Sequence, residues 1–157
     1  MQEIERKFLV GSVDFKEQAS KKTHFVQAYL NTHPERTIRI RISGEKAFMT
    51  IKGKSSKNGL SRFEWEKEIE TAEAKQLLKL CEPGKIEKYR YLIPKGKHTY
   101  EVDEFLGENR GLVLAEIELT SEEEEFEKPD WLGEEVTGDL KYYNSNLIAK
   151  PYINWHQ

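Results

Sequence analysis

The chain has 157 residues, a length typical of one domain, and we expect a single domain over residues 1–157. Its net charge of −3 gives no basic excess for nucleic acid, and no apolar run reaches the ~20 residues that span a membrane. The single cysteine, Cys81, excludes an internal disulfide and, together with a charged N-terminus that lacks a signal peptide, predicts a cytoplasmic protein.

Most of the chain alternates between apolar and polar residues with the period of two that is typical of strands. The segments that follow this pattern are residues 1–9, 25–31, 37–43, 46–52, 61–69, 85–93, 98–106 and 112–120. Short turns join most of them, such as Gly44-Glu45, and a polar loop covers residues 53–60. We therefore expect a mainly β protein of the α+β class, an eight-stranded antiparallel β-barrel with a few helices.

Three segments have helical signals, and a fourth, within residues 12–20, has weaker ones. Residues 71–82 place apolar side chains on one face, and residues 139–150 follow Asp139 as a candidate N-cap. A capping-box spacing predicts a short helix from Ser121 to the residue before Pro129. We expect the helices at 71–82 and 139–150 to pack on apolar strand faces outside the barrel. A second interpretation has the latter close the mouth of the barrel.

Ionised side chains gather on one face of each predicted strand. Arg39 and Arg41 share a face opposite Ile40, and Glu116 and Glu118 repeat the pattern. Such faces are common on the wet side of a sheet. Here, however, like charges recur two residues apart over several strands, and uncharged polar residues are scarce among them. We therefore expect the ionised faces to line a water-filled channel.

Both signs of charge would then meet in that channel. The expected cations are Lys7, Arg39, Arg41, Lys52, Lys88 and Arg90, and the expected carboxylates are Glu3, Glu5, Glu64, Glu66, Asp103, Glu116 and Glu118. The cations suit a phosphate chain, because arginine matches phosphate oxygens in shape and charge. The carboxylates would repel that chain unless they hold Mg²⁺ or Mn²⁺, which bridge to phosphate oxygens.

The segment Glu3-Ile4-Glu5-Arg6-Lys7 resembles the E-x-E-x-K signature of the CYTH domain, or triphosphate tunnel metalloenzyme, family. Later elements match in order over essentially the whole chain: Tyr29-Leu30, Arg39-x-Arg41, Lys52, Arg62-x-Glu64-x-Glu66, Lys88-x-Arg90, Asp103, Glu116-x-Glu118 and the closing segment 133–144. The resemblance implies a tunnel that binds a triphosphate compound with Mg²⁺ or Mn²⁺.

Carried over residue by residue, the resemblance implies that the six cations bind phosphate and that the seven carboxylates hold metal. The catalytic candidates are Lys7, Tyr29, Glu64 and Glu66. Lys7 would donate to the leaving oxygen, and either a second metal or a carboxylate such as Glu64 or Glu66 would position the attacking water. Tyr29 would work beside Lys7, or it would pack at the barrel rim.

Four functions are compatible with these residues. We favour hydrolysis of inorganic tripolyphosphate, because no segment indicates a pocket for an organic group. A thiamine triphosphatase would need an aromatic shelf, and a class IV adenylate cyclase would need an adenine pocket. The fourth alternative is a non-catalytic module that binds polyphosphate or nucleotides. The partner is then a small triphosphate rather than nucleic acid or membrane, and a homodimer is compatible with the sequence.

Overall fold

The computed structural model of the chain describes residues 2–155. Its strands are β1 (Gln2–Val10), β2 (Lys21–Asn31), β3 (Arg36–Ser43), β4 (Lys46–Gly53), β5 (Ser61–Ile69), β6 (Ile86–Lys95), β7 (His98–Phe105), β8 (Val113–Glu118) and β9 (Leu132–Glu135). The helices are α1 (Phe15–Gln18), α2 (Thr71–Leu78) and α3 (Asn144–Ala149), with short 3₁₀ turns η1 (Gly107–Asn109), η2 (Leu140–Tyr142) and η3 (Tyr152–Asn154). Within residues 2–155, no helix is long and apolar enough to cross a membrane.

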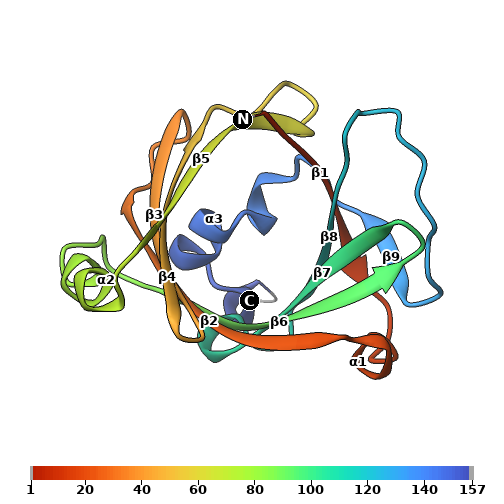
Figure 1. Cartoon of the computed structure of the whole chain (residues 1–157), viewed down its shortest axis with the longest axis horizontal. Coiled ribbons are helices and arrows are strands. Elements are labelled where there is room, and N and C mark those ends of the chain that lie inside the picture. The colour runs from red at the N-terminus through yellow and green to blue at the C-terminus, as the bar shows by residue number, and fades with distance from the viewer. Residues whose placement is uncertain (1, 156–157) are drawn as a thin grey trace.

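Eight strands close into an antiparallel barrel (Figure 1). Their order is β5-β4-β3-β2-β6-β7-β8-β1, and β1 pairs back to β5 through Glu3 and Arg62. The first half of β1 pairs with β5 on this edge, whereas its second half pairs with β9. The expected eight-stranded barrel is therefore confirmed. The ninth strand was missed because its sequence, Leu132–Glu135, is short and carries no alternation.

The apolar strand faces point outward and are covered in two places. On one side, Tyr91, Tyr100 and Ile117 pack with Phe15 of α1 and with Trp131. On the other side, Ile40 and Ala47 pack with Ala74 of α2. Figure 1 shows α2 outside β3 and β4, and the segment between β8 and β9 outside the barrel on the opposite side. These two covers leave the ionised faces for the interior.

The C-terminal segment fills one end of the barrel interior, where α3 lies inside the ring of strands in Figure 1. Leu147 of α3 and Tyr142 of η2 pack against Ile86, Phe105 and Leu114. These three strand residues share a face with the charged residues of β6, β7 and β8, so they point inward. The interpretation that this segment closes the barrel is confirmed, and the expectation that it packs on the outer wall is wrong. We call residues 137–149 the plug.

The short helix expected between Ser121 and Pro129 does not form. The carboxylate of Glu124 accepts hydrogen bonds from the backbone N and the Oγ1 of Thr120, as a capping residue does, and it also pairs with His98. The chain then extends, because Phe126 packs against Tyr100 and Phe8 on the barrel wall. Tertiary packing of one aromatic ring therefore overrides the local capping signal.

Candidate active site

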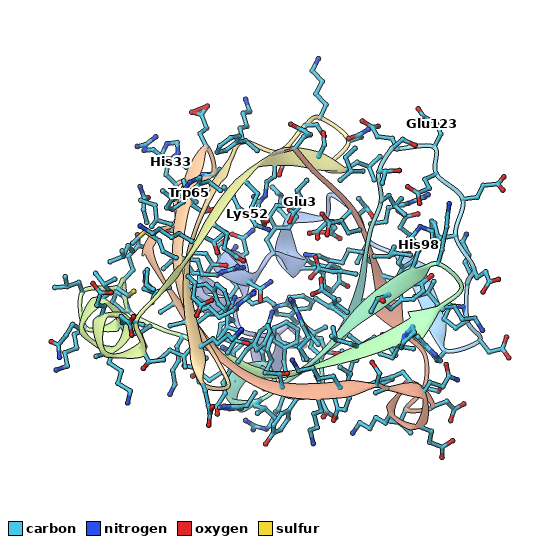
Figure 2. All side chains as sticks on the ribbon, in the orientation of Figure 1. Glu3, His33, Lys52, Trp65, His98 and Glu123 are labelled. Atoms are coloured by element: carbon cyan, nitrogen blue, oxygen red, sulfur yellow. The ribbon has the colours of Figure 1, made fainter. Side chains whose placement is uncertain are left out.

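The inner faces of the strands and the plug enclose a cavity of about 280 Å³. Twelve of the fourteen predicted site residues line it: Glu3, Glu5, Lys7, Tyr29, Arg39, Arg41, Lys52, Glu64, Glu66, Arg90, Glu116 and Glu118. The barrel brings them together because side chains two apart on a strand share a face. Figure 2 labels Glu3 and Lys52 beside each other within the ring of strands, and Lys52 Nζ lies 3.0 Å from Glu3 Oε1.

Carboxylates dominate the wall formed by β1, β7 and β8. Burial and the neighbouring Glu116 raise the pKa of Glu5 well above its ordinary value. Burial, Glu3 and Glu101 likewise raise the pKa of Glu118. Burial opposes ionisation of Glu116 too, but Lys7 and the hydrogen bond with Glu5 bring its pKa well below the ordinary value. The wall therefore carries more carboxylates than its cations neutralise.

Three cavity cations are held by carboxylates. Lys52 Nζ lies within 3.3 Å of both Glu3 and Glu64. Arg39 lies 3.5 Å from Glu66, and both bond Thr50 Oγ1, yet Arg39 Nε is buried without a hydrogen-bond partner within the described chain.

Arg90, the third of them, pairs with Asp103, Glu101 and, at 4.0 Å, Glu116. Much of the charge on these side chains is already balanced within the protein.

Lys88 and Asp103 share the inner face but lie behind the cavity wall. Lys88 Nζ lies 2.7 Å from Asp103 Oδ2, and their side chains are 0% and 2% exposed. Burial lowers the pKa of Lys88 to about 7. Burial would raise the pKa of Asp103, but Arg90 and Lys88 together lower it to about 2. Lys88 also donates to Asn144 at the start of α3, so this pair ties the plug to the barrel.

Three further cavity cations, Lys7, Arg41 and Arg62, have no carboxylate within 4.0 Å among residues 2–155. Arg41 Nε donates to the amide oxygen of Gln27 at 3.0 Å, and burial together with Arg39 and Arg90 lowers the pKa of Arg41 well below its ordinary value. Lys7 Nζ donates to the carbonyl oxygen of Tyr142. A buried cation without a counter-charge is costly, so this arrangement indicates a site that receives an anion.

Comparison with known proteins gives the family. A model of the CYTH domain matches residues 1–152. The chain belongs to the CYTH domain family. An inorganic triphosphatase of Acetivibrio thermocellus is 47% identical over 156 residues, which cover 99% of this chain and 98% of that protein. An inorganic triphosphatase of Nitrosomonas europaea is 39% identical over 152 residues, covering 94% of this chain and 97% of that protein.

The fold agrees with these relatives. The crystal structure of an inorganic triphosphatase aligns with a TM-score of 0.65 at 34% identity, and the alignment covers 93% of each chain. The CYTH resemblance inferred from the sequence, with the tunnel fold that it implies, is therefore confirmed.

CYTH triphosphatases depend on a metal, and the acidic wall fits one. Within residues 2–155, no group of three or more His, Cys, Asp or Glu side chains converges into a complete metal site. The carboxylates occur as close neighbours instead, such as Glu5 with Glu116, and burial together with Glu116 raises the pKa of Glu5. Mg²⁺ is commonly bound by one or two carboxylates, water and substrate phosphates. The donor set therefore suits a cation that arrives with its substrate.

Several cavity residues were not among the predicted site residues. Arg62 and Glu101 lie on charged strand faces, so strand period could have found them. Gln27 is buried at 0% exposure and bonds Arg41, but a lone glutamine in a strand carries no sequence signal. Tyr143 and Asn144 line the cavity from the plug, and their placement depends on how that segment folds into the barrel.

Proposed function

We propose that this CYTH protein hydrolyses inorganic tripolyphosphate with the help of Mg²⁺ or Mn²⁺. The observation that carries the proposal is the division of one cavity into an acidic wall and a set of cations without carboxylate partners. A phosphate chain with a divalent cation is the ligand that satisfies both. The two curated relatives, named inorganic triphosphatases at 47% and 39% identity, support the same activity.

In this proposal, the cavity cations bind phosphate oxygens through charge-assisted hydrogen bonds. Arg41 and Lys7 make the strongest contributions, because neither forms a direct ion pair among residues 2–155; Lys7 acts on Glu116 only from beyond 4.0 Å. The orphaned Nε of Arg39 adds one donor. Lys88 and Asp103 remain behind the wall, where they hold Arg90 and the plug in place rather than touching substrate or metal.

Glu3, Glu5, Glu116 and Glu118 would hold the cation. When bound, it supplies neutralisation of the phosphate oxygens and a more acidic water molecule. Hydrolysis breaks one anhydride P–O bond, and water supplies the oxygen that joins the released phosphate. Lys7 donates to the departing pyrophosphate oxygen, with Tyr29 beside the phosphate site. Glu64 or Glu66, both in the cavity, orients the water for in-line attack.

The cavity favours an inorganic substrate over a nucleotide or thiamine derivative. Among the lining residues that the structure describes, Leu60 is the only aliphatic side chain. The ring of Tyr143 is already in contact with two cations, and Tyr29 is 7% exposed. No apolar shelf for a base or a thiazolium is therefore formed by these residues.

The test is an assay of phosphate release from tripolyphosphate, thiamine triphosphate and ATP, each with Mg²⁺ and with Mn²⁺. We expect the kcat/KM for tripolyphosphate to exceed those for thiamine triphosphate and ATP by more than about tenfold. The cavity offers no favourable contacts to the thiamine rings or to adenosine. Activity should vanish in excess EDTA. Cyclic AMP as the main product, or thiamine triphosphate as the best substrate, would contradict the proposal.

A further inference from the structure

The cavity cations differ in what holds them, and Arg41 stands apart, bonded to Gln27 with its Cζ 4.5 Å from the ring centroid of Phe25. Arg39, Lys52 and Arg90 are held by carboxylates. Lys7 and Arg62 are instead held by one aromatic ring: Lys7 Nζ lies 4.9 Å and Arg62 Cζ 5.6 Å from the ring centroid of Tyr143. Tyr143 is therefore shared by two cations that have no carboxylate ion pair within residues 2–155.

This distinction matters for a substrate that carries several negative charges. A carboxylate that orients a cation also neutralises it and repels an incoming phosphate. An aromatic ring attracts the cation through its quadrupole and leaves the net positive charge in place. Lys7 also uses only one of its three N–H donors in the hydrogen bond to the Tyr142 carbonyl oxygen, so the other two can bind phosphate. Holding by the ring therefore orients both cations without a carboxylate in direct contact with either of them.

The position of Tyr143 is fixed by the plug. Its hydroxyl lies 3.4 Å from Ser55 Oγ in the loop between β4 and β5. That loop meets the plug where Gly59 and Gly138, both with positive φ, approach so closely that a Cβ on Gly59 would collide with the Gly138 backbone. Asn144, which follows Tyr143 in the chain, accepts a hydrogen bond at its Oδ1 from Lys88 Nζ at 3.0 Å. The ring is thus held on both sides before substrate arrives.

We propose that Tyr143 is a positioning residue, whose ring orients Lys7 and Arg62 toward the phosphate chain without neutralising them. The inference deepens the proposed function and depends on it for the identity of the anion. The plug then completes the phosphate site in addition to closing the barrel.

The test compares Tyr143→Leu with Tyr143→Phe, which keeps the ring and loses only the hydroxyl. Tyr89→Leu is the matched control, because Tyr89 lies on the outer face of β6, where its ring contacts Lys22 at 4.2 Å outside the cavity. Circular dichroism and urea unfolding check that each variant folds. Tripolyphosphate binding is measured by calorimetry in EDTA, and kcat and KM are measured with metal.

We expect Tyr143→Leu to weaken metal-free tripolyphosphate binding by between about twofold and thirtyfold, the range that a cation–π contact spans, and to lower kcat as well. Tyr143→Phe should restore binding to within about twofold of the original protein. Unchanged binding in a folded Tyr143→Leu variant would overturn the inference, and so would a loss in Tyr143→Phe or in Tyr89→Leu as large as the loss in Tyr143→Leu. Because binding is read without turnover, a protein that binds tripolyphosphate but does not hydrolyse it refutes the proposed function alone.

Discussion

Replacing Glu5 with glutamine is expected to lower tripolyphosphate hydrolysis by more than about a hundredfold, because it removes one carboxylate oxygen from the acidic wall that would hold the cation. The substitution keeps the shape of the side chain, so the barrel should still fold. Phosphate release under saturating Mn²⁺ measures the effect. Glu134→Gln is the matched control, since Glu134 is an exposed carboxylate of β9 that does not line the cavity.

The same variant should change how stability depends on pH in the metal-free protein. The pKa of Glu5 is raised in the fold, so the folded chain holds a proton that the unfolded chain has lost above about pH 4.5. The contribution of Glu5 to the free energy of unfolding is therefore fully present below about pH 4.5, and it is lost as the pH rises through the pKa of Glu5 in the folded protein. Glu3 and Glu118 act in the same direction. Glu116, whose pKa is lowered, acts in the opposite direction and only at lower pH.

The urea midpoint of the original protein should therefore fall between about pH 5 and about pH 6.5, and the fall should be smaller in Glu5→Gln. This window lies below the pKa of Lys88, about 7, around and above which Lys88 adds a change of the opposite sign. The Glu134→Gln control should keep the original slope. If the urea midpoint of Glu5→Gln depends on pH as steeply as that of the original protein, Glu5 does not have the environment assigned to it. If Glu5→Gln is fully active, Glu5 does not have the assigned role.

Replacing Arg41 with methionine should lower activity while leaving the stability of the protein unchanged or higher. The side chain has no carboxylate partner, and burial beside Arg39 and Arg90 lowers its pKa, so its charge costs the folded state free energy. We expect the variant to unfold at a urea concentration at least equal to that of the original protein, even though Gln27 loses a hydrogen bond of about 1 kcal/mol.

Its activity should fall by about a hundredfold to a thousandfold, the loss typical when one preorganised donor to developing charge is removed. Arg110→Met is the control, because Arg110 is exposed and lies outside the cavity. Steady-state kinetics and urea unfolding on both variants make the comparison. A variant that is less stable and equally active would contradict the view that Arg41 awaits an anion.

The sequence predicts the walls of the cavity because strand period determines which side chains face inward. Arg39, Arg41, Glu116 and Glu118 alternate with apolar residues, and the barrel places all four in the interior. Period does not determine depth along the barrel axis. Lys88 and Asp103 have the same parity as the cavity residues, yet they lie behind the wall because they pair with each other next to the plug.

The plug itself depends on packing that no local pattern encodes. The apolar side chain of Leu147 would suit an outer face of the barrel equally well. In the fold it fills the apolar end of the interior beside Ile86 and Phe105. The contacts of Tyr143 with Lys7 and Arg62 follow from that placement. Sequence reasoning therefore recovers the charges of the site and misses the neutral side chains that orient them.

The position of the phosphate chain tests the account most directly. A crystal structure of the protein with tripolyphosphate in EDTA should show the three phosphates inside the barrel, within hydrogen-bond distance of Arg41 and Lys7 and beside the acidic wall. Phosphates bound on the outer surface, or inside but only against Arg39, Lys52 and Arg90, would contradict the central claim that the cations without carboxylate partners receive the substrate.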